Sequence, residues 1–160
     1  FYKEKPQPTK EAVNAIKEAD LIILSMGSVF TSILPNLICE EILEAMDKSK
    51  GKIMYVCNMM TQPGETEDFK VSDHVKLLNQ YLGKRKIDVV VANDGKIHEE
   101  MAKRYESLEQ KDPVELDREE TKSLVETIIS DDYVIVKNNL LRHNVLKLGL
   151  HIFGYLLELK

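Results

Sequence analysis

The chain has 160 residues, of which 43% are hydrophobic and 31% are charged, as is usual for a soluble domain large enough to bury a core. Its net charge is −5, and no cluster of Lys or Arg is interleaved with aromatic residues, which argues against nucleic acid as a partner. No apolar run approaches transmembrane length, no signal peptide is visible, and Cys39 and Cys57 lie in apolar stretches without metal-binding spacing. We therefore expect a cytoplasmic protein with reduced cysteines and no membrane span.

The first half of the chain alternates predicted helices and strands. Thr9 is a suitable N-cap for a short helix, and the apolar run Leu21–Leu24 has the length of a buried parallel strand. Pro35 opens a second predicted helix. The apolar positions of that helix include Ile38, Ile42 and Met46. Residues 53–57 form the second predicted strand.

The second half continues this alternation. Residues 71–82 have the apolar spacing of an amphipathic helix, 89–92 form a third strand, and 97–108 form another helix. Asp117 and Glu120 resemble a capping box ahead of a helix that would carry the apolar positions of 124–129. Residues 133–136 then form the fourth predicted strand, and a final helix begins near Asn144.

This order predicts an α/β fold, a three-layer sandwich around a Rossmann-like, mostly parallel sheet, with residues 1–160 as a single α/β unit. The final helix is apolar around most of its circumference and must be covered on more than one side. We expect either a second subunit, making a homo-oligomer, or another part of the native chain to pack there. The first residue is Phe1 rather than Met, which suggests a piece of a longer protein.

Three polar loops follow predicted strands, at residues 25–36, 58–72 and 137–143. The carboxyl ends of parallel strands meet at one edge of a sheet, where open α/β sheets bind ligands. In the first loop, Gly27 allows backbone amides to approach an anion closely, and hydroxyl groups surround it. These hydroxyls belong to Ser28, Thr31 and Ser32. The alternative for this loop is a glycine turn followed by ordinary Ser/Thr caps.

The second loop offers hydrogen-bonding groups for ribose or sugar hydroxyls, among them Thr61, Gln62 and Glu65. Its carboxylates could instead hold Mg²⁺ beside a diphosphate, with Asp73 as one ligand. The alternative assigns Ser72 and Asp73 to a helix cap, and leaves His74 facing solvent.

The third loop ends in Arg142 and His143. Arginine is well shaped for bidentate phosphate contact, and histidine can donate to a phosphoryl oxygen. The alternative is an ordinary surface arginine followed by a histidine at a helix start.

Two motifs in these loops resemble signatures of the gluconeogenesis factor family, bacterial relatives of 2-phospho-L-lactate transferase. The first runs from Gly27 to Leu37, and the second runs from Tyr55 to Thr66 with Ser72–Val75. Arg142-His143, followed by Lys147-Leu148, is similar to the C-terminal motif of the family. The resemblance spans essentially the whole chain but covers the C-terminal half of the family fold. It therefore implies an α/β unit that is incomplete without an N-terminal half.

The resemblance implies a cytoplasmic regulatory protein that binds a nucleotide sugar such as UDP-N-acetylglucosamine. It also implies a role in growth on gluconeogenic carbon sources and in control of the cell wall and cell shape. The alternative is a Mg²⁺-dependent transferase acting on a nucleotide-diphosphate-linked acid, with Asp73 as a possible metal ligand; no other cofactor is implied. By position, the ligand-binding residues would be Gly27, Ser28, Thr31, Ser32, Asn36, Asn58, Thr61, Gln62, Gly64, Glu65, Thr66, Asp73, His74, Arg142 and His143.

Overall fold

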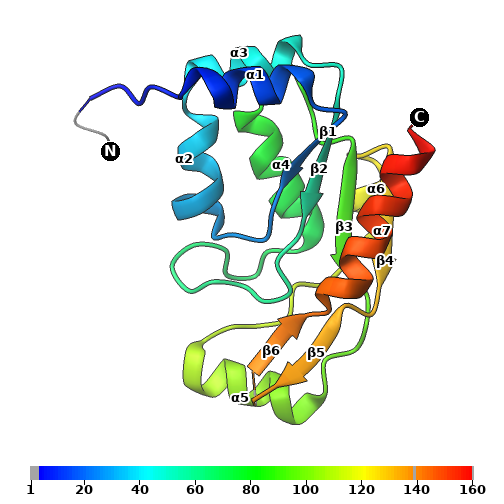
Figure 1. Ribbon diagram of the computed structural model, residues 1–160. Helices are drawn as coiled ribbons and strands as arrows, with labels where there is room; N and C mark the ends of the chain where they lie inside the picture. The colour runs from blue at the N-terminus through cyan, green and yellow to red at the C-terminus, as the bar shows by residue number, and fades with distance from the viewer. Residues whose placement is uncertain (1–3, 139, 160) are drawn as a thin grey trace.

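A four-stranded parallel sheet forms the centre of the protein. The computed structural model describes residues 4–138 and 140–159. The strands β1 (Leu21–Leu24), β2 (Lys52–Val56), β3 (Val89–Asn93) and β4 (Thr127–Asp131) lie in the order β1-β2-β3-β4 (Figure 1). Every neighbouring pair is parallel. The α/β class and the parallel sheet predicted from the sequence are therefore confirmed.

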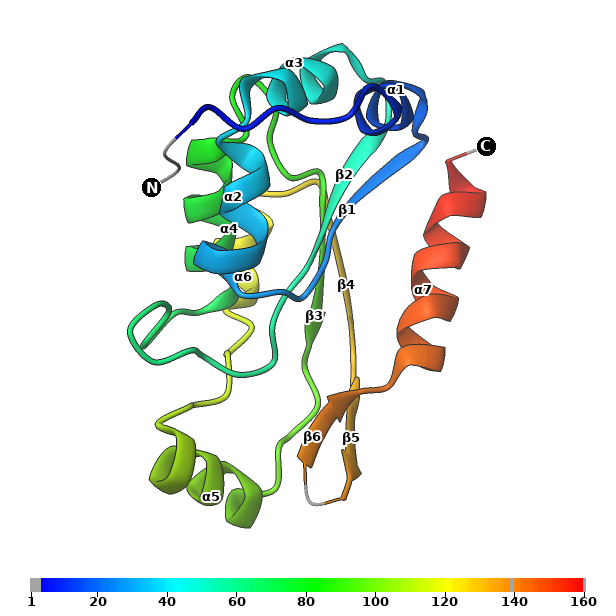
Figure 2. The same ribbon diagram turned by 60° about the vertical axis from the view of Figure 1, so that its left-hand side comes forward.

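Helices cover both faces of this sheet, but unequally (Figure 2). On one face lie α2 (Leu34–Leu37), α4 (Val71–Tyr81) and α6 (Arg118–Lys122), whereas α7 (Val145–Glu158) lies on the other. Consecutive parallel strands that are added in one direction send their right-handed crossovers to the same face, which explains the grouping. The helices α1 (Lys10–Glu18) and α3 (Glu40–Lys48) lie near the amino ends of the strands, and Thr9 caps α1 as predicted.

The strand side chains alternate between two cores, one beneath each helical layer. Ile53, Tyr55 and Val90 point toward α2 and α4, whereas Met54 and Val91 point toward α7 with its Leu148. These strands are buried on both faces, as their continuous apolar sequences predicted. The edge strand β1 is less well covered, and Ile23 remains 43% exposed.

The helix predicted from Pro35 is divided into shorter pieces. A π-helical turn, η1 (Val29–Ile33), leads into α2, and the chain then becomes extended at Cys39 before α3 begins. Ile38 falls at this break and is 47% exposed, although the sequence pattern placed it on the buried face of one continuous helix. The apolar spacing was correct for α3 alone, because it does not report a change in chain direction between two short helices.

The assignment of the fourth strand was wrong. The helix predicted to carry the apolar positions of 124–129 is replaced in part by β4, which begins at Thr127. The sheet strand predicted over 133–136 corresponds instead to β5 (Val134–Lys137). β5 pairs with β6 (Leu140–His143) in a separate antiparallel ladder. The short apolar run at 124–129 is compatible with either a helix or a strand. Residues Thr127–Asp131 form a strand because they pair with β3. The capping box also fails, because the Asp117 side chain bonds elsewhere.

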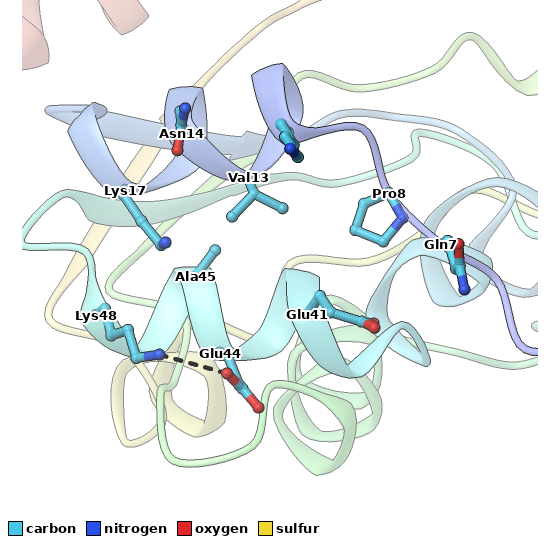
Figure 3. A pocket seen from close by; sticks show the side chains of 10 residues that line it. Gln7, Pro8, Val13, Asn14, Lys17, Glu41, Glu44, Ala45 and Lys48 are labelled. Atoms are coloured by element: carbon cyan, nitrogen blue, oxygen red, sulfur yellow. Dashed lines mark hydrogen bonds and ion pairs between the residues drawn. The ribbon is translucent and has the colours of Figure 1, made fainter.

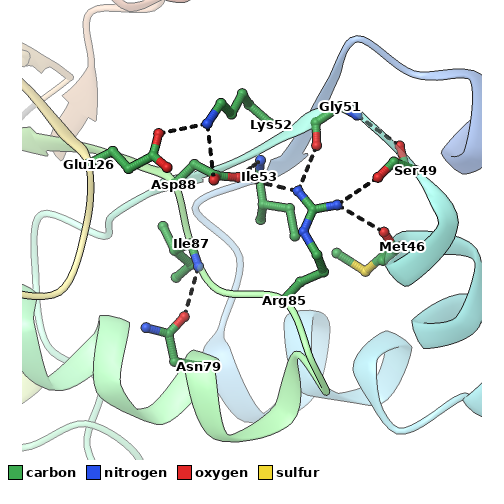
Figure 4. Close-up of polar contacts among 10 residues, drawn as sticks. All are labelled: Met46, Ser49, Gly51, Lys52, Ile53, Asn79, Arg85, Ile87, Asp88 and Glu126. Carbon is green, nitrogen blue, oxygen red and sulfur yellow. Dashed lines mark hydrogen bonds and ion pairs between the residues drawn. The ribbon is translucent and has the colours of Figure 1, made fainter.

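Arg85 ties the amino ends of the strands to the helical layer (Figure 4). Its guanidinium donates to the carbonyl oxygens of Met46, Ser49 and Gly51 at 2.8–3.1 Å. It also lies 3.5 Å from the Asp88 carboxylate, which accepts a hydrogen bond from the Ile53 backbone at 2.7 Å. One side chain thus binds carbonyls at and just beyond the end of α3, where the helix leaves acceptors without intrahelical donors.

The final helix keeps the strongly apolar character predicted for it. Asn144 caps α7 by accepting from the Lys147 backbone, and Tyr133 and Lys147 connect the helix to the sheet through His151 and Asp131. Within the described residues, no helix combines the length and the apolar character that a membrane span requires.

Candidate functional site

The first two predicted loops meet at the carboxyl edge of the sheet. The Ser28 hydroxyl donates to the Glu65 carboxylate at 2.6 Å, and the Asn58 side-chain amide donates to the Gly27 carbonyl at 3.1 Å. These contacts join segments that lie more than 30 residues apart in the sequence. The convergence of polar groups from two strand ends is therefore a property of the tertiary structure.

Ser28 has a structural role as well. Its hydroxyl oxygen accepts from the Thr31 backbone at 3.2 Å and from the Thr31 hydroxyl at 2.7 Å, so Ser28 is the N-cap of η1. Gly27 is required beside it, because a Cβ there would lie 2.8 Å from the Cβ of Ser32. The Ser/Thr cap that was the alternative to ligand binding in this loop is therefore present.

The second loop is held rigidly by its own side chains. The Gln62 backbone donates to the Thr66 hydroxyl at 3.0 Å, and the Thr66 backbone donates back to the Gln62 carbonyl at 2.9 Å. Thr61 is buried and accepts from the Asp112 backbone at 2.9 Å. Gly64 adopts φ +72°, a conformation that glycine reaches without strain. Thr61 and Thr66 thus shape the loop.

His74 is fully buried, against the expectation that it could face solvent. Its Nδ1 lies 3.1 Å from the Tyr55 hydroxyl, and its ring is edge-on to Phe69. Burial lowers the pKa of His74 to about 4, so the neutral imidazole is the native form. Its Nε2 is buried without a hydrogen-bond partner.

Of the two residues predicted to cap the helix, only Asp73 does so. Asp73 accepts from the Lys70 backbone at 3.0 Å and caps α4, whereas Ser72 lies inside the helix. The Ser72 backbone and hydroxyl both donate to the Asp117 carboxylate. Burial raises the pKa of Asp117, but the hydrogen bonds from Ser72 and Thr121 outweigh it and leave the pKa lowered.

The Asp73 carboxylate also faces Lys76 at 3.9 Å. Within the described part of the chain, no three His, Cys, Asp or Glu side chains gather in a way that could hold a metal ion.

Arg142 and His143 do reach the second loop, although the third loop is not a strand-to-helix connection. Both residues lie on β6, and Asn139, in the same predicted loop, falls outside the described residues. Tyr105 of α5 (Glu99–Glu109) fixes this hairpin, since its hydroxyl accepts from the Leu141 backbone at 2.9 Å. The pKa of His143 is lowered by burial, which a hydrogen bond to the Cys57 backbone opposes. Arg142 is exposed.

A cavity of about 290 Å³ lies between the second loop and the hairpin. Asn58 and Gln62 line one side, and Arg142 and His143 line the other. The Gln62 side-chain oxygen is buried and has no hydrogen-bond partner. The sequence interpretation missed further lining residues, which are Met26, Met59, Met60, Tyr105, Glu109, Lys111, Leu140 and Leu141. Met59 and Met60 lie within the second motif and Met26 directly precedes the first, whereas Tyr105 and Lys111 join the site only through the position of α5 and the segment after it.

Three other predicted residues face a different hollow. Gly27, Ser32 and Asn36 line a mostly apolar groove of about 410 Å³ along β1, together with side chains from α1 and α3. The Asn36 amide donates to the Ser32 carbonyl at 2.8 Å. The cavity and this groove therefore hold different predicted residues, and the Asn58–Gly27 contact joins the two hollows. The other predicted residues line neither hollow; they are Ser28, Thr31, Gly64, Glu65, Thr66, Asp73 and His74.

A groove of about 470 Å³ lies at the opposite end of the molecule, between α1 and α3 (Figure 3). Lys17, Glu44 and Lys48 line it, and Lys48 pairs with Glu44 at 3.3 Å. These helices lie near the amino ends of the strands, away from the loops described above. The Lys48 and Glu44 side chains in it are exposed and of opposite charge, which gives no indication of a specific ligand.

Comparisons with known proteins agree with the fold and the motifs. Residues 1–134 match the family described as 2-phospho-L-lactate transferase CofD. The gluconeogenesis factor of Bacillus subtilis (strain 168) is 43% identical over 146 residues, which are 91% of this chain and 46% of that protein.

Two crystal structures of a Bacillus halodurans protein, described in one case as a member of the UPF0052 family, each have a TM-score of 0.86 at 35% identity. The first covers 92% of this chain and 47% of the solved chain. The chain thus spans about half the length of the relatives that it matches.

Proposed function

The chain belongs to the 2-phospho-L-lactate transferase CofD family, and we propose that its carboxyl-edge cavity binds a nucleotide-linked ligand, in the first instance a nucleotide sugar such as UDP-N-acetylglucosamine. The observation that carries the proposal is the cavity itself. Gln62 and Arg142, 80 residues apart in the sequence, line one hollow with the motif residues Asn58 and His143. Concave sites at strand ends, into which polar groups from several loops converge, are the usual ligand sites of open sheets.

The charges favour one orientation of the ligand. Arg142 is exposed at the cavity and supplies positive charge for a diphosphate, while His143 is a neutral partner at pH 7 because its pKa is lowered. The Glu65 carboxylate lies 2.6 Å from the Ser28 hydroxyl. An anionic carboxylate disfavours phosphate there and suits ribose or sugar hydroxyls. The diphosphate would therefore lie by Arg142, and the sugar by Ser28 and Glu65.

The methionine side chains suit the base. Met26, Met59 and Met60 line the same cavity as Gln62. Methionine adapts to flat ring faces, and the unpaired Gln62 oxygen would accept a hydrogen bond from a base N–H. A volume of about 290 Å³ accommodates part of a nucleotide sugar, so the remainder would extend over the Asn58–Gly27 contact toward Glu65.

Calorimetric titration of the intact protein with UDP-N-acetylglucosamine tests this proposal. We expect Arg142→Ala to weaken binding by about 10- to 100-fold, because a charge-assisted contact contributes about 1.5–3 kcal/mol. Lys137→Ala, which removes a positive charge from β5 of the same hairpin, is the matched control and should bind like the unmodified protein. Absence of binding heat, or equal affinity of the two variants, would refute the proposal.

The wider role follows the names of the relatives. The Bacillus subtilis relative is named a gluconeogenesis factor. We propose that this protein acts in the cytoplasm as a ligand-responsive regulator, needed for growth on gluconeogenic carbon sources and for cell-wall and cell-shape control. Growth of a deletion strain on a gluconeogenic carbon source, rescued by the intact gene but not by the Arg142→Ala variant, would support this role. Normal growth and shape of the deletion strain would contradict it.

A transferase reaction is the second candidate, favoured by the match of residues 1–134 to 2-phospho-L-lactate transferase CofD. Asp73 already caps α4, so a catalytic Mg²⁺ would draw other ligands from the substrate diphosphate or from polypeptide outside these 160 residues. The intact protein would then release GMP from a lactyl-diphosphoguanosine donor in a Mg²⁺-dependent manner when a deazaflavin acceptor is present. Failure to release GMP under these conditions would remove this candidate.

We further propose that the sheet continues beyond β1 in the intact protein. The chain spans about half of its relatives, β1 is an edge strand, and the groove beside it is mostly apolar. Apolar edge strands that are left open invite pairing. Residues 1–160 would then be one α/β unit completed by an N-terminal half. The N–H groups of Leu21 and Ile23 face away from β2, so slow amide hydrogen exchange at these two residues in the intact protein, and faster exchange in the isolated 160 residues, is the expected result.

A further inference from the structure

A second positive charge lies at the proposed ligand cavity. Lys111 lines this cavity together with Arg142. Glu109 lines it as well, and its carboxylate pairs with the Lys111 ammonium at 2.7 Å. The side chains of the pair are 31% and 40% exposed, so water still reaches both of them. The cavity therefore offers two cations, of which Lys111 is already paired.

The backbone around Lys111 is joined to the second loop. The Asp112 backbone donates to the Thr61 hydroxyl at 2.9 Å, and its carbonyl accepts from the Thr61 backbone at 2.8 Å. Val114 donates to the Met59 carbonyl at 2.9 Å. Because Thr61 is buried, these contacts are shielded from water. The Lys111 side chain thus extends from a well-held backbone on the wall that the second loop forms.

The end of α5 also positions the opposite wall. The Tyr105 hydroxyl accepts from the Leu141 backbone at 2.9 Å, and Leu141 directly precedes Arg142 on β6. The Lys111 backbone in turn donates to the Tyr105 carbonyl at 3.2 Å. One turn of backbone therefore fixes the two cations relative to each other and leaves their charged groups free to contact a ligand.

We infer, as a step that rests on the proposed nucleotide-linked ligand, that Lys111 is a second cationic contact for the ligand diphosphate. Glu109 holds the ammonium at the cavity until phosphate oxygens replace the carboxylate. A partly exposed ion pair contributes little stability, so Lys111 can leave Glu109 easily. A diphosphate carries more negative charge than one carboxylate and offers more acceptor oxygens, which favours the exchange.

The pair should make the cavity selective for ligands with two phosphates. In the empty cavity Glu109 offsets the charge of Lys111, and Arg142 is left to attract an anion. A ligand with one phosphate is satisfied by Arg142 and gains little from displacing Glu109. A diphosphate has a second phosphate for Lys111, so its affinity should depend on this lysine more strongly.

The alternative is an ordinary surface ion pair, and the same helix contains one for comparison. Lys103 pairs with Glu99 at 2.7 Å, the same distance as in the Lys111–Glu109 pair. Its side chains are 70% and 80% exposed, and neither residue lines the cavity. Lys103 and Glu99 therefore supply matched control variants.

Calorimetric titration of the intact protein with UDP-N-acetylglucosamine, inorganic pyrophosphate and UMP tests the role of Lys111. Lys111→Met keeps the length of the side chain without its charge. It should weaken binding of the first two compounds by about 10-fold and binding of UMP by less than about 2-fold. Lys103→Met should bind all three compounds like the unmodified protein.

Glu109→Gln should act in the opposite direction. We expect it to tighten binding of UDP-N-acetylglucosamine by about 3-fold, because Lys111 no longer has to leave a carboxylate. Glu99→Gln should leave the affinity unchanged.

Two further readouts separate ligand contact from a structural role. Added salt should weaken binding less in Lys111→Met than in the unmodified protein, because one ionic contact fewer is screened. The melting temperatures of Lys111→Met and Glu109→Gln should stay within about 2 °C of the unmodified protein, as expected for a partly exposed ion pair.

The three compounds distinguish a failure of the Lys111 contact from a failure of the proposed function. If UDP-N-acetylglucosamine binds and Arg142→Ala weakens it but Lys111→Met does not, the Lys111 contact is overturned and the proposed function stands. If pyrophosphate binds through Lys111 but UDP-N-acetylglucosamine gives no heat, the contact stands and the nucleotide sugar is the wrong ligand. Weaker binding by Glu109→Gln would overturn the exchange between Glu109 and phosphate. Absence of binding by all three compounds would refute both proposals.

Discussion

The Ser28 hydroxyl donates a hydrogen bond to the Glu65 carboxylate across 2.6 Å, although the two residues are 37 positions apart. Ser28 caps η1 after β1, and Glu65 belongs to the loop after β2. Together with the Asn58–Gly27 contact, this hydrogen bond sets the distance between the two loops that contain the family motifs. It also places a negative charge where the sequence alone had suggested a phosphate.

Glu65→Ala should weaken binding of UDP-N-acetylglucosamine by about 10-fold, because both the proposed sugar contact and the alignment of the loops are lost. Glu65→Gln keeps an acceptor for Ser28 and should lose less affinity. Stability should fall by only about 1 kcal/mol in Glu65→Ala, as for a single part-buried hydrogen bond. Calorimetry and thermal unfolding of the three proteins measure both quantities. Tighter binding by Glu65→Ala would show that the carboxylate faces a phosphate.

Asp117→Ala should destabilise the protein by about 2–4 kcal/mol. The change removes the acceptor of the Ser72 backbone, the Ser72 hydroxyl and the Thr121 hydroxyl, and leaves these donors unpaired where Ser72 and Thr121 are buried. Asp112→Ala, at an exposed position that offers only its backbone to Thr61, is the control. Equal urea midpoints for the two variants would contradict this account of Asp117.

His74 should make stability depend on pH. Its native pKa is about 4 because of burial, below the value of about 6.5 expected when the chain is unfolded. The unfolded state therefore binds more protons in this window, so the free energy of unfolding falls as pH decreases from about 6.5 to about 4. The loss should approach about 3 kcal/mol at most, and it should be complete below the native pKa.

Urea denaturation of the protein and of His74→Phe at several pH values between 4 and 8 measures this effect. Phenylalanine cannot titrate, and the site is already apolar through Phe69. The difference in stability between the two proteins should change with pH in this window and stay constant above it. Parallel pH curves would mean that His74 is not the titrating group.

Arg85→Ala should lower the free energy of unfolding by about 3 kcal/mol, because it removes the guanidinium donor of the Ser49 and Gly51 carbonyls and one of the two donors of the Met46 carbonyl. Arg85→Lys should recover only part of this loss, since one ammonium cannot reach all three acceptors in the planar arrangement of a guanidinium. Lys84→Ala, at the exposed neighbouring position, should have little effect. Ligand affinity should be unchanged in all three variants, because Arg85 lies near the amino ends of the strands.

Much of the fold could be predicted from the pattern of apolar residues. The three strands 21–24, 52–56 and 89–93, the helix from Val71 and the Thr9 cap all have local signals that the structure confirms. The fourth strand has no such local signal, because an apolar run such as 124–129 fits a helix or a strand equally well. Pairing with β3 decided that choice, and pairing depends on residues almost 40 positions away.

In the candidate site, too, some features follow from the sequence and others depend on the tertiary structure. The sequence by itself determined which polar residues follow β1 and β2, because parallel strands bring their carboxyl ends to one edge. Only the tertiary structure decided which of those residues line the cavity, and it added Tyr105 from α5 and Lys111 from the segment after α5. It also turned Thr66 and His74 inward and left the outer side of α7 uncovered. The reason is physical: local spacing determines which side of an element is apolar, whereas burial, charge and cavity shape depend on what packs against that side.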